Sequence, residues 1–181
     1  MFGGLAIPLA ALFLPRTVLL CSVAAVTFIF LAFELLRLKA PSLNRWFLSR
    51  FKPLLREKEQ SRLTGSSYVL ISSLIAFLAF QRDIAVLALS FLAVGDAVST
   101  MVGESIGKRK FLGKTVEGDL ACLISCVVTG LAFRYAAVDV PLLTILVGSV
   151  SATLIDAISL PVNDNLTIPL FAGVVMTVMH L

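Results

Sequence analysis

Long apolar runs separated by short polar segments make up most of this chain. Each run is continuous, whereas the strands of a membrane β-barrel would alternate between apolar and polar residues. Several runs approach the roughly 20 residues that a helix needs to cross the hydrocarbon core of a bilayer. The pattern predicts an all-α fold, a polytopic transmembrane helical bundle with six or seven spans. The predicted spans are Gly3–Leu14, Thr17–Leu36, Ser67–Phe80, Ile84–Val102, Gly118–Phe133, Pro141–Leu160 and Leu166–Leu181.

The composition agrees with this pattern. Of the 181 residues, 59% are hydrophobic and 14% are charged, and the mean hydropathy is +1.00. A soluble domain is usually closer to half apolar and a quarter charged. We expect one integral-membrane domain over residues 1–181, surrounded by membrane lipids and without a nucleic-acid partner. Gly3–Leu14 and Ser67–Phe80 are short for a full crossing, so either could be tilted or half-embedded.

Basic residues are concentrated in two of the connections. Eight of the 15 lysines and arginines lie in Arg37–Ser66, and four more lie in Gly103–Glu117. The other three, on the opposite turns, are Arg16, Arg82 and Arg134. Because positively charged loops stay on the cytoplasmic side, this bias predicts that both basic segments, and the linker Val162–Asn165, face the cytoplasm.

A basic amphipathic helix is predicted in the cytoplasmic segment 37–66. Its apolar residues fit one helical face, which would lie in the membrane interface. The residues of that face are Trp46, Phe47, Phe51, Leu54 and Leu55, and the helix would end at Pro53. Surface charge pairs explain the charged residues that follow, and the alternative is that Arg56 or Arg62 contacts a nucleotide.

Asp96 stands inside an apolar run, where a carboxylate is costly unless it is paired, hydrated or bound to a metal. On a helix it would share a face with Ser99 and Gly103. Small residues recur every four positions from Gly95 to Gly107, a spacing that also suits close packing of two helices. We therefore expect a functional role for Asp96, with helix packing as the alternative for the glycines.

The following segment, residues 103–117, combines glycines, cations and a hydroxyl, which together suit phosphate binding. It has no Walker A pattern, so its spacing alone identifies no known phosphate loop. The candidate nucleotide-binding residues are Gly103, Gly107, Lys108, Arg109, Gly113, Lys114 and Thr115. Contact with anionic lipid is the alternative, but the flanking carboxylates Asp96 and Glu117 favour a site for phosphate and metal.

A second polar group precedes the last predicted span. Asn163, Asp164 and Asn165 follow one another there, and they would also make an ordinary turn or helix N-cap. Asp164 would be a second acidic ligand for Mg²⁺, which usually takes one or two carboxylates together with phosphate oxygens and waters. Asp156 could line the same cavity, and Asp119 could cap a helix. We rank these two below Asp96 and Asp164.

At these residues the chain resembles the CTP-dependent polyprenol kinase family, which includes dolichol kinase, phytol kinase and yeast-type diacylglycerol kinase. The resemblance runs from about Glu34 to the C-terminus. It rests on the motifs LLREKEQSRLTG (54–65), GDAVSTMVGESIGKRKFLGKTVEG (95–118) and DNLTIP (164–169). The chain departs from many relatives because no Arg-Lys pair precedes Lys108 and no histidine lies on an early helix.

The resemblance implies roles for the residues that match these motifs. Asp96 would be the essential acid, and Lys114, Thr115 and Glu117 would belong to the nucleotide loop. Asp164 and Asn165 would form the final motif of the family.

A membrane kinase that moves the γ-phosphoryl of CTP to the hydroxyl of a polyprenol-type alcohol or diacylglycerol is therefore expected. Mg²⁺ would be held by Asp96, Asp164 and Glu117, while Lys114 offsets the charge on the transferred group. Asp96 would either accept the hydroxyl proton or bind the metal. The alternatives are a CTP:lipid-phosphate cytidylyltransferase that makes a CDP-lipid, and a small anion transporter or channel. The spacing Gly103–Gly107 also permits a homodimer.

Overall fold

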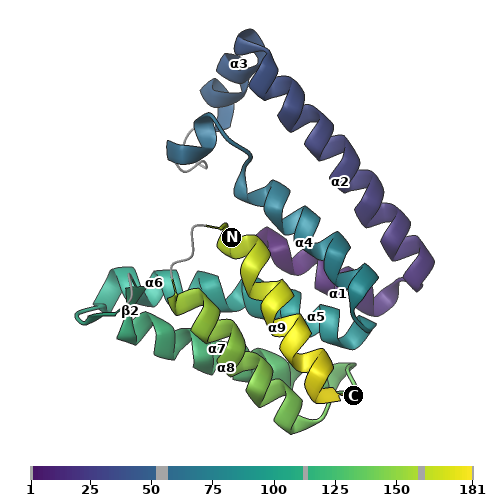
Figure 1. The fold of residues 1–181 in the computed structure, drawn as a ribbon, viewed down its shortest axis with the longest axis vertical. Helices are drawn as coiled ribbons and strands as arrows, with labels where there is room; N and C mark the ends of the chain where they lie inside the picture. Colours follow the sequence, from purple (N-terminus) through teal and green to yellow (C-terminus); the bar gives the residue numbers. More distant parts are fainter. Residues whose placement is uncertain (1, 52–56, 112–113, 159–161, 181) are drawn as a thin grey trace.

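The structure is a computed structural model of the chain, and it describes residues 2–51, 57–111, 114–158 and 162–180. The fold is all-α, as predicted, apart from one hairpin of two short strands. Most helices form one bundle, while α2 and α3 extend from it as an arm (Figure 1). The elements are η1 (Phe2–Leu5), α1 (Ala6–Phe13), α2 (Arg16–Lys39), α3 (Pro41–Phe51), η3 (Glu57–Gln60), α4 (Gly65–Ala79), α5 (Arg82–Phe91), η4 (Leu92–Asp96), α6 (Ala97–Ile106), β1 (Lys110–Phe111), β2 (Lys114–Thr115), α7 (Val116–Ala136), α8 (Leu142–Ala157) and α9 (Asp164–His180).

Each predicted span overlaps a helix, although the lengths differ. Three helical stretches in the described residues are long and apolar enough to cross a membrane: Arg16–Lys39, Arg82–Ile106 and Val116–Ala136. Two shorter apolar helices are Gly65–Ala79 and Leu142–Ala157. By length and composition the chain is compatible with a membrane protein, and the total of six or seven spans stays a prediction.

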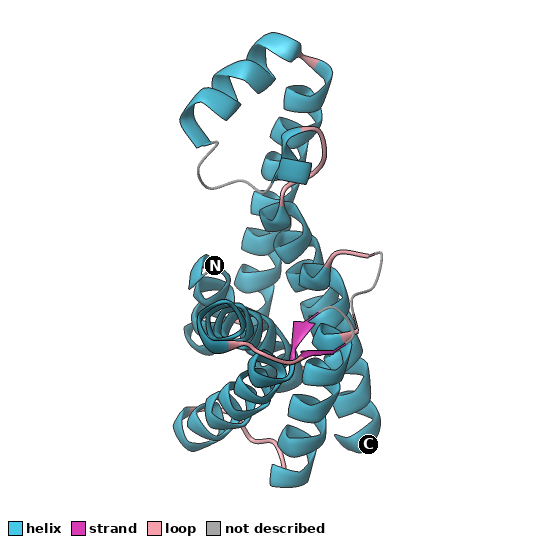
Figure 2. Cartoon of the chain, turned by 90° about the vertical axis from the view of Figure 1, so that its left-hand side faces the viewer, coloured by secondary structure: helices cyan, strands magenta, loops and turns pink. Residues whose placement is uncertain are grey.

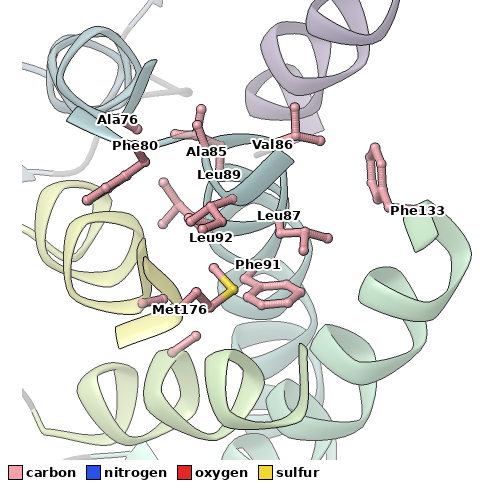
Figure 3. Packing of buried hydrophobic residues seen from close by; sticks show 14 of the residues in the cluster. Ala76, Phe80, Ala85, Val86, Leu87, Leu89, Phe91, Leu92, Phe133 and Met176 are labelled. Atoms are coloured by element: carbon pink, nitrogen blue, oxygen red, sulfur yellow. The ribbon is translucent and has the colours of Figure 1, made fainter. Parts of the chain in front are cut away.

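The core is built around α5, which is enclosed on all sides. Each residue from Ile84 to Phe91 is buried, as expected for a helix that is covered all round by other elements. Side chains from α4, α7 and α9 surround it, and Phe91 lies beside Met176 (Figure 3). Glycine permits this approach, because a Cβ at Gly148 of α8 would lie 2.4 Å from the Met176 sulfur. Helix α5 is thus the buried centre of the bundle, and Asp96 follows it on the same continuous helix.

The turns that the basic-residue bias assigns to one side do meet in the structure. The Arg82 side chain, at the start of α5, donates to the carbonyl of Ala11 in α1 and to that of Leu14, directly after α1. The Asp139 N–H, before α8, donates to Asp83 Oδ2 at 3.1 Å. The hairpin and the starts of α4 and α9 lie toward the other end of the bundle (Figure 1).

Helix α2 is only lightly covered by the rest of the protein. One stripe, with Leu19, Val23 and Thr27, is buried, and Thr27 donates to a carbonyl of α4. On other faces, Phe28 and Ile29 are 76% and 67% exposed. An apolar helix that exposes side chains of this size suits a lipid environment.

In the basic segment, helix α3 spans Pro41–Phe51 within the described residues. Arg37, one of the eight cations of this segment, is fully buried near the end of α2, where it pairs with Glu34. The rest of the predicted helix lies outside the described residues, as do its candidates Pro53, Leu54, Leu55 and Arg56.

Candidate functional site

A wide helical turn carries Asp96. The helix from Arg82 to Ile106 is continuous, but its middle segment η4 is π-helical. Such turns are rare and are frequently found at functional sites. Gly95 faces α7 so closely that a Cβ there would lie 2.7 Å from the Cys126 sulfur. Asp96, the next residue, lines a cavity. Within this one turn, Gly95 therefore packs against α7 while Asp96 belongs to the candidate site.

Lys114 of the hairpin reaches Asp96. Strands β1 and β2, drawn in magenta in Figure 2, pair antiparallel and stand between α6 and α7 in the chain. The Lys114 ammonium forms an ion pair with Asp156 of α8, and its Nζ lies 3.7 Å from Asp96 Oδ1. The Asp156 side chain is fully buried, while those of Lys114 and Asp96 are 23% and 13% exposed. Three segments that are distant in sequence therefore meet at one cation.

The carboxylates around Lys114 keep it charged. Burial lowers the pKa of Lys114 because the ammonium loses water, but Asp156, Asp96 and Asp164 together raise it by more. The resulting pKa lies above the ordinary value of 10.5. Lys114 is therefore a fixed positive charge near neutral pH, and a lysine of this kind binds phosphate as a point charge.

Carboxylates outnumber the cation at this cluster. Asp119, in the first turn of α7, interacts electrostatically with both Asp156 and Lys114. In the part of the chain that the structure describes, Asp119 Oδ1 and Asp156 Oδ2 are buried without a hydrogen-bond partner. Buried polar atoms of this kind are costly until a partner reaches them. The cluster is therefore short of positive charge, not of negative charge.

This donor set fits a magnesium ion that arrives with a phosphate. Among the described residues, no group of three or more His, Cys, Asp or Glu side chains is arranged to hold a metal ion by itself. Mg²⁺ prefers oxygen ligands and commonly uses one or two carboxylates, completing its octahedron with phosphate oxygens and waters. Asp96 and Asp164, both within electrostatic reach of Lys114, supply that number of carboxylates.

A cavity of about 680 Å³ adjoins Asp96. Its apolar wall comes mainly from α1, α2, α3, α4, α5 and η4, and it includes Ile7, Val26, Phe30, Phe47, Phe51, Val69, Leu70, Leu89, Leu92 and Ala93. Its polar wall is formed by Glu59, Thr64, Ser66, Asp96 and Asn165. Ligand sites are typically apolar spaces of this size with a few polar groups that fix orientation. This one suits an amphiphile with a single polar end.

The predicted nucleotide loop is narrower than residues 103–117, because Gly103 lies within α6 and Glu117 within α7. A Cβ at Gly103 would lie 2.8 Å from Thr115 Oγ1, and one at Gly107 would lie 2.6 Å from Thr115 Cγ2. The Thr115 hydroxyl also caps α7 by accepting from the Gly118 N–H at 3.2 Å. Close packing of α6 and α7 accounts for these contacts, and a role in nucleotide binding stays a prediction.

The two residues before β1 are exposed. Lys108 and Arg109 have exposed side chains, and the Arg109 N–H donates to Glu117 Oε2 at 3.3 Å. This contact ties Glu117 to the backbone of the loop. The roles predicted for Lys108 and Arg109 with phosphate, and for Glu117 with metal, stay predictions. Gly113 lies outside the described residues.

Of the three polar residues at the start of α9, Asn163 caps the helix, while Asp164 and Asn165 lie near the candidate site. Asn163 Oδ1 accepts from the Asn165 N–H at 3.0 Å, so the N-cap alternative describes Asn163 well. Asp164 interacts electrostatically with Lys114. Asn165 lines the cavity, and its side-chain amide donates to the Gly65 carbonyl at 3.2 Å.

The sequence did not indicate a buried ion pair that contacts Phe47, Glu59 and Thr64 of the cavity wall. Arg37 Nη2 lies 3.1 Å from Glu34 Oε2, and both side chains are fully buried. The same Glu34 oxygen accepts from the Thr64 N–H at 2.9 Å, and Arg37 donates to the Arg62 carbonyl at 2.9 Å. The guanidinium also stacks on Phe47, 4.6 Å from the ring centroid. The available signal was a Glu and an Arg three positions apart in an apolar helix.

Glu59 also escaped the sequence analysis, which treated it as a surface charge. Its Oε1 accepts from the Gly65 N–H at 2.6 Å, and its side chain lines the cavity. Its backbone carbonyl accepts from both Nη atoms of Arg37 at 3.4 Å. The buried ion pair therefore sets the position of an acid at the polar wall.

Comparison with known proteins gives one relative without an assigned activity. The chain is similar to "Uncharacterized protein RP860" of Rickettsia prowazekii (strain Madrid E), with 24% identity over 169 residues. The similarity covers 90% of this chain and 83% of that protein. No family model and no solved structure matches the chain. The similarity covers most of both chains, but the name of the relative gives no chemistry for the site.

Proposed function

We propose that the protein is a multi-pass membrane kinase that transfers the γ-phosphoryl group of CTP to the hydroxyl of a lipid alcohol. The alcohol is a polyprenol-type isoprenoid or diacylglycerol, and the reaction depends on Mg²⁺. The position of Asp96 carries the proposal, because Asp96 lines an apolar cavity and lies 3.7 Å from Lys114 Nζ. One carboxylate thereby adjoins both a space for a greasy substrate and a fixed cation for phosphate.

The cation side of Asp96 is the proposed nucleotide side. Lys114 offsets the charge that develops on the transferred phosphoryl group and on the leaving diphosphate. Asp156 anchors Lys114, because its side chain is fully buried and paired with the ammonium. The exposed cations Lys108 and Arg109 add positive charge where the nucleotide arrives. Phosphoryl transfer depends mainly on such positioning and electrostatics, so the absence of a Walker A sequence is no obstacle.

A magnesium ion would supply positive charge that offsets the negative charge of the phosphates. Asp96 and Asp164 are the residues that would hold it, with Glu117 as a third candidate. Both aspartates already interact electrostatically with Lys114, so metal and lysine would act on the same phosphates.

The cavity side of Asp96 is the proposed lipid side. The alkyl chain packs against aromatic side chains such as Phe30, Phe47 and Phe51, and each buried CH₂ contributes about 0.8 kcal/mol. The hydroxyl meets the polar wall at Asp96 and Asn165. Because α2 exposes apolar side chains, the alcohol can reach the cavity from the bilayer.

The proposed topology has six or seven spans, with the active site facing the cytoplasm. The positive-inside bias of the two basic segments supports this orientation. The three helices of full crossing length support a multi-pass chain. CTP is a cytoplasmic metabolite, so the orientation and the donor agree.

Phosphoryl transfer by purified protein in detergent tests the proposal. The protein receives Mg²⁺, γ-labelled CTP or ATP, and a panel of polyprenol, dolichol, geranylgeraniol, phytol and diacylglycerol. Asp96→Asn is compared with Glu104→Gln, which changes an exposed acid on the neighbouring helix α6. We expect labelled lipid with CTP from wild type and Glu104→Gln, and a rate about 10²–10³-fold lower from Asp96→Asn.

Two other results would redirect the assignment. Consumption of CTP only when a lipid phosphate is supplied would indicate the cytidylyltransferase. No reaction and no CTP binding would leave anion transport as the better hypothesis.

A further inference from the structure

We propose that the outer face of α3 binds the head groups of anionic phospholipids. This outer face consists of Arg45, Trp46, Ser49 and Arg50, whose spacing places them on one side of the helix. The inference rests on the membrane position proposed above, and it does not depend on the kinase reaction.

Helix α3 begins where the exposed apolar surface of α2 ends. With 24 residues, α2 is about 36 Å long, which exceeds the roughly 30 Å of a hydrocarbon core. Its exposed apolar side chains continue to Leu36, which is 60% exposed, and the exposed cation Lys39 follows in the last turn. Only Ala40 separates α2 from α3, which turns back from the end of α2 (Figure 1). With α2 in the bilayer, α3 therefore starts at the bilayer surface.

The inner side of α3 is already occupied by the protein. The Phe47 ring lies 5.7 Å from the Phe33 ring and 4.6 Å from the Arg37 guanidinium carbon, measured to the ring centroids. Phe47 and Phe51 also line the cavity. The predicted apolar face of this segment grouped Trp46 with these two residues, but Trp46 stays 53% exposed. Trp46 therefore belongs to the side of α3 that the rest of the protein leaves open.

The outer face combines positive charge with an aromatic ring. Arg45 and Arg50 are exposed, and within the described residues neither of them forms an ion pair. No acidic residue occurs in the sequence from position 38 to position 56. Basic side chains next to a membrane helix attract anionic lipids, and tryptophan prefers the level of the head groups. Two arginines beside one tryptophan thus match a lipid phosphate that carries net negative charge.

Fluorescence of Trp46 reports on this face alone, because the chain contains a single tryptophan. The full-length protein is reconstituted in phosphatidylcholine vesicles that hold increasing fractions of brominated phosphatidylcholine or brominated phosphatidylglycerol. The bromines are placed on the upper part of the acyl chain, where they quench a tryptophan that touches the lipid. We expect half-maximal quenching at a fraction of the anionic lipid about 5-fold lower than that of phosphatidylcholine, the ratio that corresponds to the attraction of one arginine.

A double variant tests the two arginines. Arg45→Gln/Arg50→Gln keeps Trp46 and removes both cations, so the two quenching curves should coincide. The matched control is Arg16→Gln/Lys110→Gln, which removes two exposed cations outside α3 and gives the same net charge. This control should keep the preference for phosphatidylglycerol.

Each contrary result has a separate meaning. Equal quenching by both lipids in the wild type overturns the inference, because the face then meets the bilayer without selecting charge. No quenching by either lipid, in protein that floats with the vesicles, also overturns it and indicates water or a protein partner at Trp46. A preference that survives in Arg45→Gln/Arg50→Gln overturns the role of the arginines.

Flotation separates this inference from the function proposed above. A protein that does not float with the vesicles overturns the membrane position, and the proposed function and this inference fail together. A protein that floats, prefers phosphatidylglycerol and phosphorylates no alcohol overturns the kinase and supports the lipid-binding face.

Discussion

Two clusters of buried charge in this protein are built differently. In the first, one carboxylate and one guanidinium, Glu34 and Arg37, pair at 3.1 Å and are completely buried. In the second, Lys114 is the single cation among several carboxylates, and its side chain is partly exposed. One of these carboxylates, Asp96, lines the cavity. Each cluster leaves two buried polar atoms without a hydrogen-bond partner within the described residues. The clusters therefore differ in their balance of charge but not in the number of buried polar atoms that lack a hydrogen bond.

Under the proposed function, this difference identifies the second cluster as the ligand-binding one. A balanced pair has no charge left for a ligand, and its hydrogen bonds to the carbonyls of Glu59 and Arg62 join α2 to the segment before α4. An excess of carboxylates leaves negative charge that can bind a cation together with its phosphate. Buried carboxylates beside cations are thus structural in one place and candidates for chemistry in another.

Breaking the balanced pair should have the largest effect. In Arg37→Met the buried Glu34 carboxylate loses its counter-charge, and we expect the free energy of unfolding to fall by about 3–5 kcal/mol. Unfolding by sodium dodecyl sulfate in mixed micelles measures the change. Arg50→Met, which removes an exposed cation from α3, is the control. Equal stability of the two variants would contradict a structural role for the pair.

Removing the cation of the second cluster should affect the reaction strongly. In Lys114→Met we expect the phosphoryl-transfer rate to fall about 10²–10³-fold, because the charge on the transferred group is no longer offset. Lys114→Arg keeps the charge and should recover part of the rate. Lys39→Met, at an exposed position near the end of α2, is the control and should transfer normally. A fully active Lys114→Met would remove this lysine from the mechanism.

The glycine contacts behind the second cluster predict a smaller effect. A Cβ at Gly103 would lie 2.8 Å from Thr115 Oγ1, so Gly103→Ala should cost about 1–3 kcal/mol of stability through overpacking. Thr115→Ala removes that atom, and in a double-mutant cycle the two substitutions should cost less together than their sum. Strict additivity would show that the α6–α7 contact is not the reason for this glycine.

The smallest expected effect is on the pH dependence of stability, which tests the excess of carboxylates around Lys114. The folded pKa of Lys114 lies above its unfolded value of 10.5, so its contribution is complete below pH 10.5 and is lost as pH rises through the folded pKa. Asp156→Asn removes the carboxylate that raises this pKa most, so the alkaline loss of stability should be smaller and should be complete at a lower pH. Detergent unfolding across the alkaline range measures this shift. An unchanged profile would mean that Asp156 does not hold the lysine.

The sequence predicted the positions of the helices better than the side-chain contacts between them. Continuous apolar runs identified the helices, because burial in lipid or in a helical core leaves a local pattern. Asp96 and Lys114 were also selected in advance, since an acid in an apolar run and a cation beside glycines are local signals. In the structure, Lys114 Nζ lies 3.7 Å from Asp96 Oδ1.

The remaining features depend on contacts between distant segments. Asp156 was ranked low, yet it pairs with Lys114, which lies 42 positions earlier. Glu59 looks like an ordinary surface charge in the sequence and gains its position from Arg37 and Gly65. The close approach of Gly103 to Thr115 and Gly118 could not be predicted until the position of α7 was known.

The fate of the CTP phosphates is the most direct test of the central claim. Purified protein with Mg²⁺ and the lipid alcohols would receive CTP labelled at the α-phosphorus in one reaction and at the γ-phosphorus in another. A kinase must transfer only the γ-label to the lipid fraction and leave the α-label in soluble CDP, which is the result that we expect. Transfer of the α-label to lipid, or transfer of neither label, would contradict the account.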